Sequence, residues 1–300
     1  MGQILITGAS GTIGRIVARQ LIETGAPVRL ARRPAERTAP SPHPTDPRGM
    51  HGSDPVQQMA FDFADPATWP AAFADVETMF LLRPPAVANV RRDLIPAVAA
   101  ARSAGVRHVV FLSLQGAEHN RLTPHAAVEK WLRASGMAWT FIRPSFFCQN
   151  LSSTHASDIR DRDAIMVPAG GGATAFVDAE DVGAVAAAAL GDPAEHAGRA
   201  WTVTGPRALT YEQVAQILTG ELGRPIRYAR PGLAAYARHA RTALGMPWPM
   251  VAVTAAIYTS ARFGLAAGLT GDVRAVLGRD PIDLSAFAHR ERAAWARPAA

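Results

Sequence analysis

The stretch Thr7-Gly8-Ala9-Ser10-Gly11-Thr12-Ile13-Gly14 decides the fold, because it joins an apolar run at residues 4–7 to an amphipathic run at 12–24. The β-branched residues before it predict a buried strand, and the apolar residues that recur on one face after it predict a helix. Between a strand and a helix, Gly8 permits a tight turn and Gly14 lets the two elements pack closely. Gly11 lets a pyrophosphate approach the backbone.

This context predicts a dinucleotide-binding loop, since phosphates then face the free amides and the positive end of the helix dipole. The spacing Gly-x-x-Gly-x-x-Gly makes the turn one residue longer than in the simplest dinucleotide fingerprint. The expected cofactor contacts in this stretch are Gly8, Ser10, Gly11, Thr12, Ile13 and Gly14.

The end of the second expected strand, at residues 28–31, indicates which dinucleotide is bound. An acidic residue there would accept hydrogen bonds from the adenosine ribose, whereas arginine suits a 2′-phosphate. Arg32 and Arg33 occupy this place, so NADPH is predicted over NADH, with Arg32 the stronger candidate. The alternative is two solvated surface arginines.

Strands and helices alternate through the first half of the chain. Strands are expected at residues 59–63, 78–82, 108–114 and 138–142, and helices after Pro66, at 86–104 and at 124–135. This rhythm predicts an α/β protein with a Rossmann-type doubly wound parallel sheet. We expect residues 1–145 to form the NADP-binding domain and 146–300 a smaller substrate lobe that contributes partly to the sheet. Residues 34–55 are expected to form an exposed loop, and the role of the proline-rich segment 34–57 stays open.

Ligands of open α/β sheets bind at the carboxyl ends of the strands. We therefore expect five further cofactor contacts after successive strands, at Asp62 with Phe63, at Leu82 with Arg83, and at Pro144. A substrate wall is expected next, from Phe146, Phe147 and Asn150, although packing of the lobe would also use aromatic residues.

Composition excludes several classes of protein. The net charge of +6 comes from scattered arginines without a nucleic-acid-binding signature, so no nucleic-acid partner is expected. A single cysteine, Cys148, excludes an internal disulfide and a multi-cysteine metal site, and no metal is predicted. The apolar stretch at 248–269 is too interrupted for a membrane span, so no membrane partner is expected. It could close a substrate pocket or form an interface. We expect a cytoplasmic monomer or homodimer.

Of 31 basic residues only one, Lys130, is lysine. Because an ammonium and a guanidinium are not interchangeable at a tight site, this residue is a candidate for a chemical role, against chance survival in an arginine-rich chain.

Several segments make the chain resemble the NmrA-like, atypical short-chain dehydrogenase/reductase family, which includes type 2 quinone oxidoreductases, triphenylmethane reductases and isoflavone-reductase-like enzymes. They are residues 7–14, 103–110 leading to Ser113, 128–130, 134–136, 140–144, 178–183 and 276–279. The likeness spans nearly the whole chain and is more specific for the family than for the substrate.

The resemblance implies a site in which serine, tyrosine and lysine act together, with the tyrosine as proton donor. Ser113 and Lys130 match the serine and the lysine, but Ala126 stands at the tyrosine position. His125 either supplies a proton instead or points to solvent. Ser113 either orients the substrate or bonds its own backbone.

The prediction is therefore an NADPH-dependent reductase that passes hydride to a flat conjugated small molecule. A quinone, an azo or triarylmethane dye, or an enone would fit, because the added charge is delocalised and needs no tyrosine. Two alternatives remain open: a non-catalytic regulatory protein that senses NADP(H), and a natural-product tailoring reductase or non-redox enzyme.

Overall fold

A computed structural model describes residues 2–33 and 56–297, which form two compact units. The first unit comprises Met1–Pro144 and Val182–Val203, and the second comprises Ser145–Asp181 and Thr204–Ala300. The chain therefore leaves the first unit after residue 144 and returns to it for two helices and a strand. The expected loop at 34–55 lies outside the described residues.

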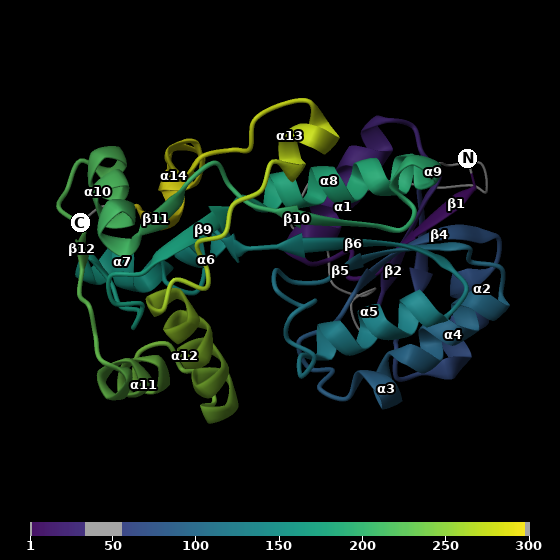
Figure 1. Cartoon of the computed structure of the whole chain (residues 1–300), viewed down its shortest axis with the longest axis horizontal. Coiled ribbons are helices and arrows are strands. Elements are labelled where there is room, and N and C mark those ends of the chain that lie inside the picture. The colour runs from purple at the N-terminus through teal and green to yellow at the C-terminus, as the bar shows by residue number, and fades with distance from the viewer. Residues whose placement is uncertain (1, 34–55, 298–300) are drawn as a thin grey trace. The chain divides into compact units, whose positions relative to one another are not determined.

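A seven-stranded parallel sheet, in the order β10-β6-β5-β4-β1-β2-β3, forms the centre of the first unit (Figure 1). The order reverses between β1 and β4, so a crevice is expected there at the carboxyl ends of the strands. This arrangement confirms the predicted Rossmann-type fold. Its strands are β1 (Gln3–Ile6), β2 (Val28–Arg32), β3 (Val56–Ala60), β4 (Val76–Leu82), β5 (His108–Leu112), β6 (Ala138–Pro144) and β10 (Arg199–Val203).

Helices cover both faces of this sheet (Figure 1). On one face α1 and α8 pack so closely that a Cβ on Gly183 would lie 2.3 Å from Cγ2 of Ile16. The other face carries a core cluster that includes Phe73, Phe111 and Leu132. The helices are α1 (Thr12–Glu23), η2 (Pro66–Thr68), α2 (Trp69–Phe73), α3 (Val90–Asp93), α4 (Ile95–Ser103), α5 (Pro124–Ala134), α8 (Ala179–Gly191) and α9 (Pro193–His196).

Two expected elements differ most from the structure, and the bounds of several others shift by one or two residues. The helix predicted at 86–104 is divided into α3 and α4, because Pro96 at the start of α4 has no amide hydrogen with which to continue the preceding turn. The third strand, β3, ends at Ala60 rather than Phe63, so Asp62 and Phe63 lie in the turn that follows it.

The second unit contains short strands and a separate core. Its three-stranded sheet has the order β11-β9-β7, and β12 pairs with β8. The strands are β7 (Phe146–Phe147), β8 (Ala164–Ile165), β9 (Ala173–Val177), β11 (Ala208–Thr210) and β12 (Arg227–Tyr228). The helices are α6 (Gln149–Ser152), α7 (Ala156–Arg162), α10 (Tyr211–Leu222), α11 (Leu233–Thr242), α12 (Trp248–Arg262), α13 (Asp272–Leu277), α14 (Leu284–Glu291) and η3 (Arg292–Trp295).

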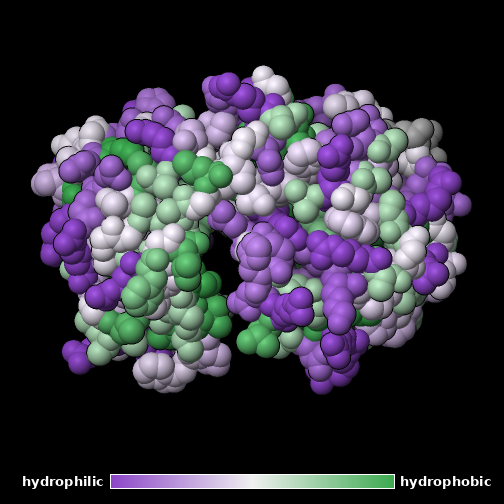
Figure 2. Space-filling view, in the orientation of Figure 1, coloured by the Kyte–Doolittle hydropathy of each residue, from purple (hydrophilic) through white to green (hydrophobic). Residues whose placement is uncertain are grey.

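The surface of α12 is unusually apolar (Figure 2). Trp248, Val253 and Ile257 are 61%, 54% and 43% exposed, although large apolar side chains are usually buried. Within the described ranges, no helix has both the length and the apolar character that crossing a membrane requires.

Candidate functional site

The loop between β1 and α1 is built so that only glycine fits it. Gly8 has a left-handed φ of +66° and its carbonyl accepts the amide of Gly11 at 2.9 Å. A Cβ on Gly14 would lie 2.2 Å from that same carbonyl oxygen, so the helix can approach the loop only without a side chain here. The contacts agree with the packing roles that the sequence assigned to Gly8 and Gly14.

The first turn of α1 leaves its backbone donors available. Gly11 is the N-cap residue and offers no side chain to the amides of the first turn, and this turn contains no acidic residue. Ser10, Thr12 and Ile13 lie at this helix end as expected. Backbone amides without a side-chain cap and the positive end of the helix suit a pyrophosphate, so the residues of this loop fit a dinucleotide.

Thr7 ties this loop to the neighbouring strand, and sequence reasoning did not single it out as a site residue. Its hydroxyl donates to the carbonyl of Phe80 at 2.9 Å and accepts the amide of Leu82 at 2.9 Å. The side chain of Leu82 in turn lies 3.3 Å from the place of a Cβ on Gly8. The glycine loop and the end of β4 are therefore held together.

Arg32 is the last residue of β2. Its Nε is buried and has no hydrogen-bond partner among the residues that the structure describes. Arg33 is exposed and has a partner of its own. An unpaired buried donor is costly, so Arg32 fits the role of holding an anion better than that of a solvated surface arginine.

Asp62 and Phe63 shape the turn after β3. One carboxylate oxygen of Asp62 accepts the amide of Ala64 at 2.9 Å, and its carbonyl accepts the indole of Trp69 at 2.9 Å. Phe63 stands edge-on to Phe61, with ring centroids 4.8 Å apart. These contacts stabilise the turn, and the contact of Asp62 and Phe63 with adenine stays a prediction.

Arg83, directly after β4, bonds to a histidine 42 positions later. Its guanidinium donates to the carbonyl of Val87 at 2.7 Å and to Nε2 of His125 at 3.4 Å. Because guanidinium has no acceptor, Nε2 must accept, and the hydrogen of the neutral ring is placed on Nδ1. That Nδ1 is buried and unpartnered within the described part of the chain.

The environment of His125 decides its charge. Burial, with a smaller contribution from the nearby Arg83, lowers the pKa of His125 to about 4, against an opposing effect of Glu129. The ring stacks on Phe111, with centroids 6.0 Å apart, and is only partly exposed. It therefore does not extend into solvent, and at neutral pH it offers a neutral N–H rather than an imidazolium proton.

Ser113 bonds to a buried carboxylate that sequence reasoning missed. Its hydroxyl donates to Glu129 at 2.7 Å, and Arg143 donates to both oxygens of Glu129 at 2.9 and 2.6 Å. Glu118 also pairs with Arg143, at 3.1 Å. Ser113 therefore does not bond its own backbone. This network joins the end regions of β5 and β6 to α5.

Helix α5 presents Ala126 and Lys130 next to this network. Thr123 caps it by accepting the amide of Ala126 at 3.2 Å, and Pro124 occupies the first turn. Ala126 is half-buried, and Lys130 is exposed, with no hydrogen bond or ion pair to any described residue. The lysine is thus available to an incoming molecule, and no side chain at 126 can transfer a proton.

The expected substrate wall falls after β6. The carbonyl of Pro144, the last residue of β6, accepts the amide of Gln115 at 3.0 Å. In the second unit, Phe146 and Phe147 form β7, and Phe146 packs on Tyr258 with centroids 6.4 Å apart. Asn150 is exposed. Phe146 thus takes part in lobe packing, and contact of these three residues with substrate stays a prediction.

Asp178 and Asp181, within the segment 178–183 that carries the family resemblance, have structural partners. Asp178 accepts the amide of Glu180 at 3.0 Å and pairs with Arg290 at 2.7 Å. Asp181 pairs with Arg279 at 2.7 Å, and its burial raises its pKa. Asp178 therefore caps α8, and both carboxylates also bind arginines from near the end of the chain.

Comparison with known proteins identifies relatives over the whole length. The NmrA-like family matches residues 1–261. An NAD(P)H azoreductase of Xenophilus azovorans is 36% identical over 97% of this chain and 99% of the relative. A (4-alkanoyl-5-oxo-2,5-dihydrofuran-3-yl)methyl phosphate reductase of Streptomyces griseus is 36% identical over 92% of this chain and 93% of the relative.

A solved structure shares the fold. It is a new type of NADPH-dependent quinone oxidoreductase from Escherichia coli, 25% identical, with a TM-score of 0.78 over 96% of this chain and 98% of that one. The glycine loop, the sheet order and the extent of the match agree, and the chain therefore belongs to the NmrA-like family.

Proposed function

We propose that this NAD(P)H-dependent oxidoreductase takes its hydride from NADPH and reduces a flat conjugated acceptor: a quinone, an azo or triarylmethane dye, or an enone. The observation that carries the proposal is the combination of an available phosphate-binding loop with alanine at the position of the usual proton donor. The names of the relatives support these acceptors, since one reduces azo compounds and another a conjugated furanone.

The bound cofactor would supply a hydride, and the protein supplies its position. Arg32 would hold the 2′-phosphate through its uncommitted Nε, and Lys130 the nicotinamide ribose. Orienting the nicotinamide and the acceptor and excluding water would substantially lower the activation barrier for hydride transfer, without a proton donor in the protein. An acceptor that delocalises the added charge can then take its proton from water.

His125 and Ser113 have distinct roles in this proposal. The hydroxyl hydrogen of Ser113 is committed to Glu129, so toward a substrate Ser113 can only accept a hydrogen bond. The Nδ1–H of His125 is the complementary donor, and it would hydrogen-bond the oxygen or nitrogen on which negative charge develops. Phe146 and Phe147 would stack on the flat acceptor, with Asn150 at its edge.

The test follows the nicotinamide absorbance while purified protein is mixed with NADPH and a panel of quinones, azo dyes and enones. We expect turnover with at least one class, and slower turnover with NADH. Simple aliphatic ketones, whose reduction requires a proton donor such as tyrosine, should not react. Turnover of such ketones in place of the conjugated acceptors would contradict the proposal.

A non-catalytic NADP(H) sensor is the second candidate, favoured by Ala126 and by the neutral state of His125. It predicts tight NADPH binding, no turnover with any acceptor, and saturable binding of a protein partner. A tailoring enzyme predicts turnover only with a narrow set of natural-product-like enones, so the same panel separates the three.

A further inference from the structure

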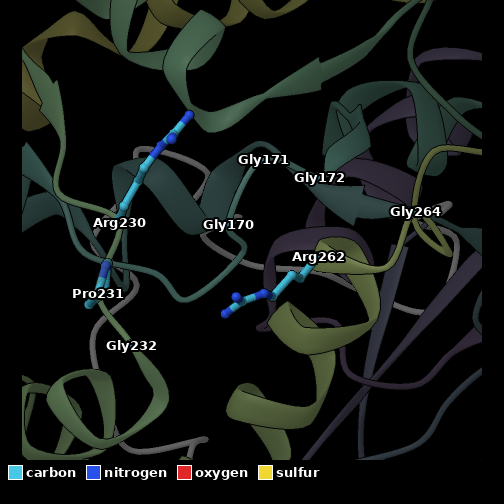
Figure 3. A pocket seen from close by; sticks show the side chains of 8 residues that line it. All are labelled: Gly170, Gly171, Gly172, Arg230, Pro231, Gly232, Arg262 and Gly264. Atoms are coloured by element: carbon cyan, nitrogen blue, oxygen red, sulfur yellow. The ribbon is translucent and has the colours of Figure 1, made fainter.

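A cavity of about 630 Å³ lies within the second unit, and no role above involves it (Figure 3). Three segments line it: residues 170–172 between β8 and β9, residues 230–232 between β12 and α11, and the end of α12 at Arg262 and Gly264. Its volume is in the range of sites for small organic molecules.

The backbone around this cavity is held in place by close packing. A Cβ on Gly172 would lie 1.9 Å from the carbonyl oxygen of Ala261, so the loop at residues 170–172 packs directly on the end of α12. Gly170 has a left-handed φ of +58°. A Cβ built on it would lie 3.1 Å from Cγ of Arg262, so its absence leaves room for the aliphatic part of that side chain. The loop therefore determines where the stem of Arg262 runs.

The two arginines of the cavity differ in what they can bind. Arg230 pairs with Glu212 and points away from the opening, whereas Arg262 projects into it (Figure 3). The guanidinium of Arg262 makes neither a hydrogen bond nor an ion pair with any residue in the described ranges. Arg262 is thus the charged group that remains available to a ligand.

Among the described residues that line the cavity, no carboxylate competes for this guanidinium. The lining residues include no Asp or Glu, and residues 222–271 contain six arginines and no acidic residue. At the rim, α11 begins after Gly232 without a side-chain cap and without an acid in its first turn. The one unpaired charge among the described lining residues is therefore positive.

From the cavity and its uncommitted arginine we propose a second anion-binding site, which takes the phosphate group of a small organic phosphate with Arg262 as its anchor. A guanidinium binds phosphate through two parallel hydrogen bonds, and the remaining volume accommodates the organic part. The proposal concerns only the second unit and does not depend on the identity of the hydride acceptor.

The experiment titrates glucose 6-phosphate and, separately, inorganic phosphate into protein saturated with NADP⁺, so that the predicted cofactor phosphate site is filled. We expect saturable binding of one molecule per chain by calorimetry. Arg262→Gln should weaken it at least about tenfold, and Arg262→Lys should weaken it less, because the charge is kept but the paired hydrogen bonds are lost.

Arg238→Gln is the matched control, since Arg238 is an exposed arginine of α11 outside the cavity and should change the affinity less than about twofold. Tighter binding of the sugar phosphate than of inorganic phosphate would show that the cavity also binds the organic part of the ligand. No saturable binding, equal losses in Arg238→Gln and Arg262→Gln, or a loss only in Arg32→Gln would each overturn the second site. Unchanged thermal unfolding of Arg262→Gln without phosphate confirms that the variant is folded.

Discussion

The glycine loop and the region around α5 lie at the same carboxyl edge of the first unit's sheet, yet they are specified in different ways. The loop depends on backbone geometry within eight consecutive residues, where Gly8 has a left-handed φ of +66° and Gly14 leaves no space for a side chain. The α5 region depends on side chains that meet from distant positions, such as Arg83 with His125 and Ser113 with Glu129. The predicted pyrophosphate contact is therefore local in the sequence, whereas the side-chain contacts of the α5 region are not.

The largest expected effect concerns the buried carboxylate of the α5 region. Glu129→Gln removes the charge that two arginines and Ser113 bind, and we expect a loss of about 3 kcal/mol in the free energy of unfolding. Denaturant unfolding measures it. Glu118→Gln is the control, because Glu118 is the more exposed partner of Arg143 and should cost less than about 1 kcal/mol. Equal losses in the two variants would mean that Glu129 is not the centre of the network.

A single side chain at position 14 should disrupt the glycine loop and weaken NADPH binding. Gly14→Val places a Cβ where the carbonyl oxygen of Gly8 lies, so the loop must shift, and NADPH affinity should fall about 100-fold. Fluorescence titration of NADPH checks the loss. In the control Gly220→Ala, the added Cβ meets open space on a helix, and affinity should stay unchanged. Retained affinity in Gly14→Val would exclude the loop as the pyrophosphate site.

The choice of cofactor should depend on one arginine. Arg32→Gln removes the guanidinium whose Nε has no partner in the described ranges, and we expect NADPH to bind about tenfold more weakly while NADH binding changes little. Dissociation constants for both cofactors measure this difference, with Arg33→Gln as the matched control. An equal loss for NADPH and NADH would refute contact between Arg32 and the 2′-phosphate.

The smallest expected effect is the absence of a His125 titration step from the pH profile of kcat. With a pKa of about 4 in the folded state, His125 stays neutral through pH 6.5, so kcat should show no step there. The unfolded chain binds more protons than the folded one between about pH 6.5 and 4, so His125 makes stability fall as the pH is lowered through that window.

His125→Asn should make this fall less steep. The remaining slope belongs partly to His108 and His155, whose pKa values burial also lowers to about 4. Stability curves of both proteins from pH 4 to 7 measure the difference. A step in the wild-type kcat near pH 6.5 that His125→Asn abolishes would show that His125 acts as an imidazolium.

The glycine loop could be predicted from the sequence, whereas the side-chain contacts of the α5 region could not. The parallel sheet and the loop could be read from the sequence, because apolar runs and glycine spacing are local signals. The burial of Glu129 could not, since a glutamate beside Lys130 on a helix is usually solvated, and its burial depends on Arg143 from strand β6. The pairing of Arg83 with His125 joins residues 42 positions apart and has no sequence pattern. The short strands β7 and β8 have only two residues each, too few for a period to show.

The return of the chain to the first sheet has a consequence for biosynthesis. β10 pairs with β6 along its whole length, from Arg199 with Thr140 to Val203 with Pro144. A nascent chain that has emerged only to residue 144 would therefore present β6 as an open edge strand, with the unpaired amides and carbonyls that promote association between chains. Completion of the sheet must wait until the intervening part of the second unit has been synthesised. The first unit is thus not a module that could be cut from the chain at residue 144.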